Sequence, residues 1–133
     1  EILIHKAYSS LLPCIECFAG QLNQVFMNIL ANAIDALEQD SSDSPKITIS
    51  TSQINSDWIR IAIADNGRGI PSDIQAKVFD PFFTTKPIGK GTGLGMSISR
   101  QIITEQHGGH LYFQTSPQTG TEFFIELPIS RAH

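Results

Sequence analysis

The sequence has no apolar run of about 18 residues or more, the length that a membrane-spanning helix requires. Its start also lacks a basic segment followed by an apolar one, which argues against a secretory signal peptide. Basic residues are not in excess, because the net charge is -4 at pH 7, and this disfavours a general nucleic-acid binder. The first residue is not methionine, so we interpret the chain as a piece of a longer protein.

Cysteine is scarce, with only Cys14 and Cys17 in a C-x-x-C pattern. A zinc site would need two more ligands at suitable spacing, and a redox motif would need a helix that starts at the first cysteine. The flanking residues instead predict a strand over 14–18, in which the two side chains face opposite ways. We therefore interpret the pair as reduced thiols, as expected in a reducing, cytosolic compartment.

Two common phosphate-binding patterns are missing from the glycine-rich stretch at 84–100. A Walker A loop anchored on Gly89 and Lys90 would require glycine at position 84 and a hydroxyl residue at 91, and the sequence has neither. A dinucleotide fingerprint would place its third glycine on Leu94 or Met96. A phosphate bound here must therefore be held in another way.

The chain has 133 residues, the size of one domain with one core, and contains no repeat or internal linker, so we expect a single domain over 1–133. Apolar periodicity and turn residues predict strands at 2–7, 14–18, 46–54, 58–65, 110–115 and 121–128, and helices at 21–39, 71–79 and 94–106. Leu94, Ile98 and Ile102 are expected to form the buried side of the last helix. Several strands are sequential antiparallel neighbours, which predicts an α+β sandwich, one sheet with helices on one face.

Two asparagines interrupt the apolar pattern of the first predicted helix. Asn28 and Asn32 stand one turn apart on the same face. A buried asparagine is costly unless its amide is paired, so these residues either bond to a neighbouring helix or face a cleft. In a cleft their carbonyl oxygens would suit Mg²⁺, which prefers hard oxygen ligands and commonly keeps nucleotide phosphates in its shell.

A carboxylate and two glycines follow the strand predicted at 58–65. Asp65 could accept a hydrogen bond from an exocyclic amine such as that of adenine, while Gly67 and Gly69 allow a tight turn. The same residues also fit a plain turn between two elements. Farther along, glycines 91, 93 and 95 would let backbone N–H groups approach a polyphosphate at a helix start.

Five ordered motifs resemble the N, G1, F, G2 and G3 boxes of histidine kinases, in the superfamily shared with gyrase, heat-shock chaperones and mismatch-repair ATPases. The boxes fall at 24–36, 65–70, 79–83, 91–95 and 120–123. The resemblance implies the Bergerat fold, a mixed, mostly antiparallel sheet layered with about three helices, and a lid between the F and G2 boxes. It also implies ATP and Mg²⁺ as cofactors.

The resemblance further assigns roles to single residues. Asp65 would bind the adenine amine, and Asn32 together with Asn28 would bind Mg²⁺. Asn28, Asn32 and Lys86 are the expected catalytic residues. The expected nucleotide-binding residues are Asn28, Asn32, Asp65, Gly67, Gly69, Ile70, Lys86, Lys90, Gly91, Thr92, Gly93, Leu94, Gly95 and Thr121.

Two departures shape the expected mechanism. Related ATP hydrolases carry glutamate, a general base for water, at the place of Asn28, and an amide cannot accept that proton. This disfavours efficient hydrolysis and favours phosphoryl transfer to an external nucleophile. No histidine fits the family's phosphoacceptor pattern, which lies on a helical hairpin before this domain. The histidines of the chain are His5, His107, His110 and His133.

We therefore expect the catalytic domain of a sensor histidine kinase, a cytoplasmic enzyme that transfers the γ-phosphate of Mg-ATP to a histidine on a separate dimerisation hairpin. That histidine would then pass the phosphate to a response regulator. The isolated domain is expected to be monomeric, without nucleic-acid or direct membrane contact. The alternatives are a serine kinase of the same superfamily and a nucleotide-binding interaction module without transfer activity.

Overall fold

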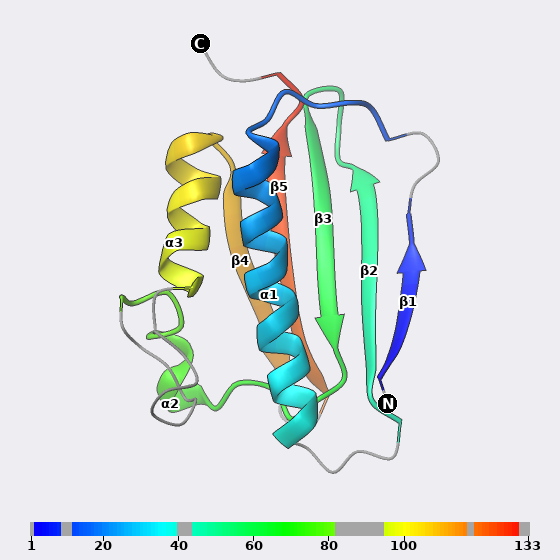
Figure 1. The fold of residues 1–133 in the computed structure, drawn as a ribbon, viewed down its shortest axis with the longest axis vertical. Helices are drawn as coiled ribbons and strands as arrows, with labels where there is room; N and C mark the ends of the chain where they lie inside the picture. Colours follow the sequence, from blue (N-terminus) through cyan, green and yellow to red (C-terminus); the bar gives the residue numbers. More distant parts are fainter. Residues whose placement is uncertain (1, 9–11, 40–43, 82–94, 117–118, 131–133) are drawn as a thin grey trace.

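The computed structural model describes residues 2–8, 12–39, 44–81, 95–116 and 119–130 (Figure 1). Five strands form one sheet in the order β1-β2-β3-β5-β4. The elements are β1 (Leu3–Ala7), α1 (Ala19–Gln39), β2 (Lys46–Gln53), β3 (Trp58–Asp65), α2 (Ser72–Gln75), α3 (Gly95–Gln101), the π-helix η1 (Ile102–Gln106), β4 (His110–Ser116) and β5 (Gly120–Pro128). The predicted α+β sandwich is thus confirmed.

Hairpins and two crossovers, one from β1 to β2 and one from β3 to β4, build the sheet. β2 and β3 pair antiparallel, as do β4 and β5, and β5 lies antiparallel to β3 in the centre. β1 joins the edge parallel to β2, so the chain must cross the sheet before it returns, and α1 makes that crossing. The register places Asp65 opposite Thr121, so the ends of the two central strands meet there.

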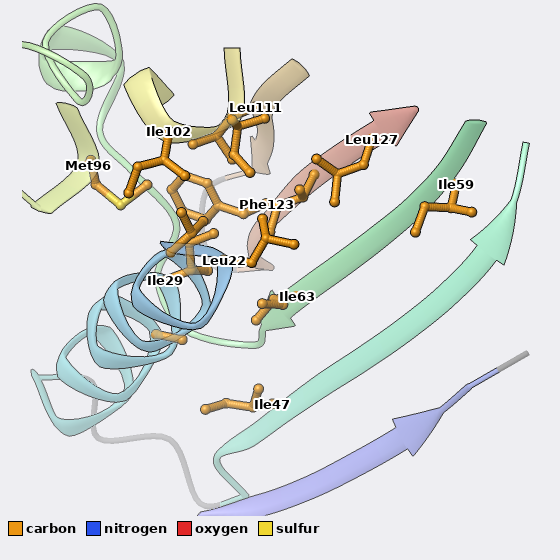
Figure 2. Packing of buried hydrophobic residues seen from close by; sticks show 14 of the residues in the cluster. Leu22, Ile29, Ile47, Ile59, Ile63, Met96, Ile102, Leu111, Phe123 and Leu127 are labelled. Atoms are coloured by element: carbon orange, nitrogen blue, oxygen red, sulfur yellow. The ribbon is translucent and has the colours of Figure 1, made fainter. Parts of the chain in front are cut away.

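The core lies between the sheet and the helices, which cover the same face (Figure 1). The buried residues of α1 recur every three or four positions, as the sequence predicted; they are Leu22, Val25, Ile29, Ala33 and Leu37. They meet side chains from β3 and β5 such as Ile63, Phe123 and Leu127 (Figure 2). Burial of these apolar side chains holds α1 against the sheet.

The strand predicted over 14–18 is wrong. Residues 12–18 form no regular element, and Glu16 N–H donates one hydrogen bond to Ile129 O at 3.0 Å. Leu12, Ile15 and Cys17 instead pack against the end of the core, so their alternation reflects a segment that closes the sandwich. Cys14 and Cys17 are both free thiols, as expected, with Cys14 exposed.

The last two helices also differ from the prediction. The helix expected over 71–79 is limited to α2, and turns follow it. The helix expected over 94–106 is α-helical only to Gln101 and continues as η1. The wider π turn buries both Ile102 and Ile103, so the buried face is Met96, Ser99, Ile102 and Ile103. Ile98 is only partly buried, and Leu94 lies outside the described residues.

Candidate functional site

Asp65 ends β3 on the face that the helices cover, and its carboxylate is held by the backbone. Gly67 N–H donates to Asp65 Oδ1 at 2.9 Å, and Thr121 N–H on the neighbouring strand also donates to the carboxylate. Burial raises the pKa of Asp65 above its ordinary value, and the two backbone hydrogen bonds partly oppose that rise. A carboxylate fixed in this way presents an acceptor of set direction to a donor on a ligand.

Two threonine hydroxyls lie between the end of β3 and the turn that follows Asp65. Thr121 Oγ1 lies 3.0 Å from Thr115 Oγ1, and Ile70 N–H donates to Thr115 Oγ1 at 2.8 Å. The predicted residues Thr121 and Ile70 are therefore joined through Thr115, which the sequence reasoning missed. The signal that could have found it is the β4–β5 hairpin register, in which Thr115 faces Thr121.

Gly69 allows the turn after Asp65 to approach β4 closely. Its φ is +83°, and a Cβ added there would lie 2.5 Å from Ser116 O, well inside contact distance. Two costs would therefore combine for a side chain at this position: an unfavourable backbone conformation and a clash with backbone.

We predict that Gly69→Ala lowers the free energy of unfolding by about 2–4 kcal/mol, because overpacking adds to left-handed strain. The matched control is Gly108→Ala, where φ is +66° and an added Cβ meets nothing within 4 Å. That variant should lose only about 1 kcal/mol. Urea denaturation of both variants measures the difference, and equal losses would show that the contact with Ser116 does not matter.

The two asparagines lie in the middle of α1. Asn28, Asn32 and Ala36 follow one another at intervals of one turn, and we call this row of residues the asparagine stripe. Asn28 Nδ2 donates to Gly95 O at 3.2 Å and to Ser99 Oγ at 3.1 Å. One turn later Asn32 is half-buried, and no described residue hydrogen-bonds to its side chain. Another turn later Ala36 meets Gly67, where an added Cβ would lie 3.6 Å from Ala36 O.

These contacts bring the described part of the predicted site together. Asp65, Gly67, Gly69, Ile70 and Thr121 gather at the ends of the central strands, and the asparagine stripe connects them to Gly95. The metal ligands that the asparagine stripe can offer are the neutral amide oxygens of Asn28 and Asn32. Such oxygens suit a Mg²⁺ ion whose charge is balanced by a polyphosphate. The other predicted residues lie outside the described residues: Lys86, Lys90, Gly91, Thr92, Gly93 and Leu94.

Phe79, the first residue of the predicted F box, anchors the chain just before the undescribed residues 82–94. Its ring packs on Phe113 and Phe123, with centroids 5.9 and 6.5 Å away. The guanidinium of Arg100 on α3 lies 4.8 Å from the centre of the Phe79 ring. This cation–π contact ties the F box to α3, and the sequence reasoning did not anticipate it.

Other kinds of site find no support among the described residues. They contain no group of three or more histidine, cysteine or acidic side chains that could hold a metal ion. In the same part of the chain, every helix is too short or too polar to cross a bilayer.

Comparison with known proteins identifies the family of the chain. Residues 19–131 match the family described as histidine kinase-, DNA gyrase B- and HSP90-like ATPases. The chain is 44% identical over 109 residues to the signal transduction histidine-protein kinase AtoS of Escherichia coli and 37% identical over 118 residues to sporulation kinase E of Bacillus subtilis. These matches cover 82% and 89% of this chain but only 17% and 15% of those relatives.

Solved structures show the same fold. The catalytic domain of histidine kinase ThkA superposes with a TM-score of 0.80 at 32% identity, over 97% of this chain and 81% of that one. Full-length ShkA in complex with AMPPNP superposes with a TM-score of 0.82 at 30% identity, and the match covers 98% of this chain and 26% of that one. ThkA in complex with response regulator TrrA superposes with a TM-score of 0.76 at 29% identity, and the match covers 96% of this chain and 34% of that one. The chain therefore belongs to the histidine kinase-, DNA gyrase B- and HSP90-like ATPase family, and its fold is that of histidine kinase catalytic domains.

Proposed function

We propose that this chain binds ATP with Mg²⁺ and transfers the γ-phosphate to a histidine on a separate dimerisation domain. The observation that carries the proposal is the arrangement around Asp65. Even partial burial of a carboxylate is costly, and the half-buried Asp65 carboxylate is fixed by two backbone N–H groups at the end of the central strands. Such a group serves a ligand better than it serves the fold.

The adenine would lie at the Asp65 end of the site. Its exocyclic amine would donate to the carboxylate, as Gly67 and Thr121 do from the protein. Thr115 and Thr121 would hold the edge of the base pocket through their paired hydroxyls. Support also comes from ShkA, whose structure contains the ATP analogue AMPPNP.

The phosphates would lie along the asparagine stripe. Asn28 and Asn32 would hold Mg²⁺ through their amide oxygens, and Gly95 lies next to Asn28 at the start of α3. The ion would supply charge stabilisation for the transferring phosphoryl group. Lys86, Lys90, Gly91, Thr92, Gly93 and Leu94 remain the predicted contacts of the phosphates.

Asn28 also bears on the type of reaction. An amide cannot accept a proton from water, so the site lacks at this position the general base that hydrolysis needs. Phosphoryl transfer to an imidazole depends mainly on positioning and charge stabilisation, which the proposed ligands provide. We therefore favour transfer over hydrolysis. ThkA has been captured with a response regulator, and a regulator would be the next acceptor here.

Calorimetric titration of the chain with a non-hydrolysable ATP analogue, with and without Mg²⁺, tests the proposal. We expect binding that becomes tighter when Mg²⁺ is present. A histidine-bearing hairpin domain should then acquire acid-labile phosphate from ATP. The lack of nucleotide binding by the folded chain would contradict the proposal, and acid-stable phosphoserine would favour a serine kinase.

A further inference from the structure

Ser99 is the polar side chain with the least exposure in the described structure, and its hydroxyl is part of a closed network with Asn28. Ser99 is fully buried, and its hydroxyl donates to Gly95 O at 2.7 Å, one turn back along α3. The same oxygen accepts a hydrogen bond from Asn28 Nδ2. Because Asn28 also donates to Gly95 O, three groups from two helices complete one another's hydrogen bonds.

This network decides which end of the Asn28 amide meets α3. Gly95 O is a carbonyl oxygen and can only accept, so the atom that faces it must be the NH₂ group. Gly95 O and Ser99 Oγ, which lie 2.7 Å from each other, both accept from this NH₂ group. No described residue donates to Asn28 Oδ1, which keeps its lone pairs for a cation.

We propose that Ser99 is a positioning residue that holds the Asn28 amide with its nitrogen at Gly95 O and Ser99 Oγ, so that its oxygen faces neither of them and is available to Mg²⁺. The inference rests on the proposed function. Ser99 itself would touch neither metal nor nucleotide. Without its hydroxyl, Asn28 keeps one hydrogen bond to Gly95 O and can turn more freely, so the amide oxygen would lose its fixed direction.

The test compares Ser99→Ala with Thr104→Ala in this chain. Thr104 Oγ1 makes the same bond to the carbonyl one turn back, Arg100 O at 2.8 Å, but it is exposed and bonds to nothing on α1. We expect Ser99→Ala to raise by about tenfold the Mg²⁺ concentration that half-maximally strengthens binding of a non-hydrolysable ATP analogue, as loss of an outer-shell partner does. Thr104→Ala should leave it unchanged.

Two further measurements separate positioning from general structural damage. Affinity for ADP without Mg²⁺ should be the same in Ser99→Ala and the parent chain. The side-chain NH₂ signals of Asn28 in a nucleotide-free NMR spectrum should lose protection from solvent exchange. Ser99→Cys, which keeps a weaker donor in a similar volume, should give an intermediate Mg²⁺ requirement. Equal losses of ADP and Mg-dependent binding would overturn the inference.

A double-mutant cycle with Asn28→Ala completes the design. If Ser99 acts through Asn28, then Ser99→Ala should change nothing further in the Asn28→Ala background. An additional loss there would overturn the positioning role. If Asn28→Ala shifts the Mg²⁺ requirement and Ser99→Ala does not, only this inference fails. If Asn28→Ala has no effect either, the proposed metal role of Asn28 fails with it.

Discussion

Asp65→Asn should weaken binding of ATP and ADP by about 100-fold or more. The amide oxygen of the new residue would still have to face Gly67 N–H, which donates to Asp65 Oδ1 at 2.9 Å. The other position of the group would then be NH₂, a donor pointed at the donating adenine amine. Nucleotide affinity thus falls for two reasons: a charge-assisted hydrogen bond is lost, and two hydrogen-bond donors are brought face to face.

The same substitution should leave the fold at least as stable at neutral pH. Burial raises the pKa of Asp65, so the folded state binds its proton more tightly than the unfolded state. Stability from this group is therefore fully present below the unfolded pKa and is lost as the pH rises through the folded one. The neutral asparagine avoids that loss of stability. The difference in free energy of unfolding between Asp65→Asn and the parent chain should therefore shrink as the pH is lowered.

Calorimetry with ADP, together with urea denaturation at neutral and acidic pH, tests both halves of the prediction. Glu122→Gln is a matched control, because it removes a carboxylate from β5 at a partly buried position one residue from Thr121. This control should bind nucleotide normally. Wild-type affinity in Asp65→Asn would refute the adenine role, and a large loss of stability would refute the argument from burial.

Asn32→Ala should remove the dependence of nucleotide binding on Mg²⁺ and reduce phosphoryl transfer to a supplied hairpin domain by about 100- to 1000-fold. Asn32 is half-buried on α1, and its side chain has no hydrogen-bonding partner among the described residues. Its truncation should therefore cost the fold little, while a metal ligand would be lost.

Asn23→Ala provides the control for that experiment, since Asn23 is an exposed asparagine on the same helix. Phosphate on the hairpin domain is followed by its acid lability after mixing with ATP. The control should transfer at the parent rate. Transfer by Asn32→Ala at that rate, with unchanged dependence on Mg²⁺, would exclude Asn32 as a metal ligand.

Most of the fold could be predicted because its signals are local. Alternation marks β2, β3, β4 and β5, and helical spacing marks α1, since each pattern reports which side of an element meets the core. The same reasoning failed at 14–18, where apolar residues alternate but close the end of the core without strand pairing. Periodicity reports burial and does not report hydrogen-bonding partners.

The sequence by itself determined the order of the motifs, the amphipathic face of α1 and the position of Asp65 at a strand end. Only the tertiary structure decided how these meet. Thr115 joins Ile70 across 45 positions, and Asn28 meets Ser99 across 71. Such contacts depend on how helices and strands pack, because residues so far apart in the chain share no local pattern. The direction of the Asn28 amide, and with it the role of Ser99, follows from that packing.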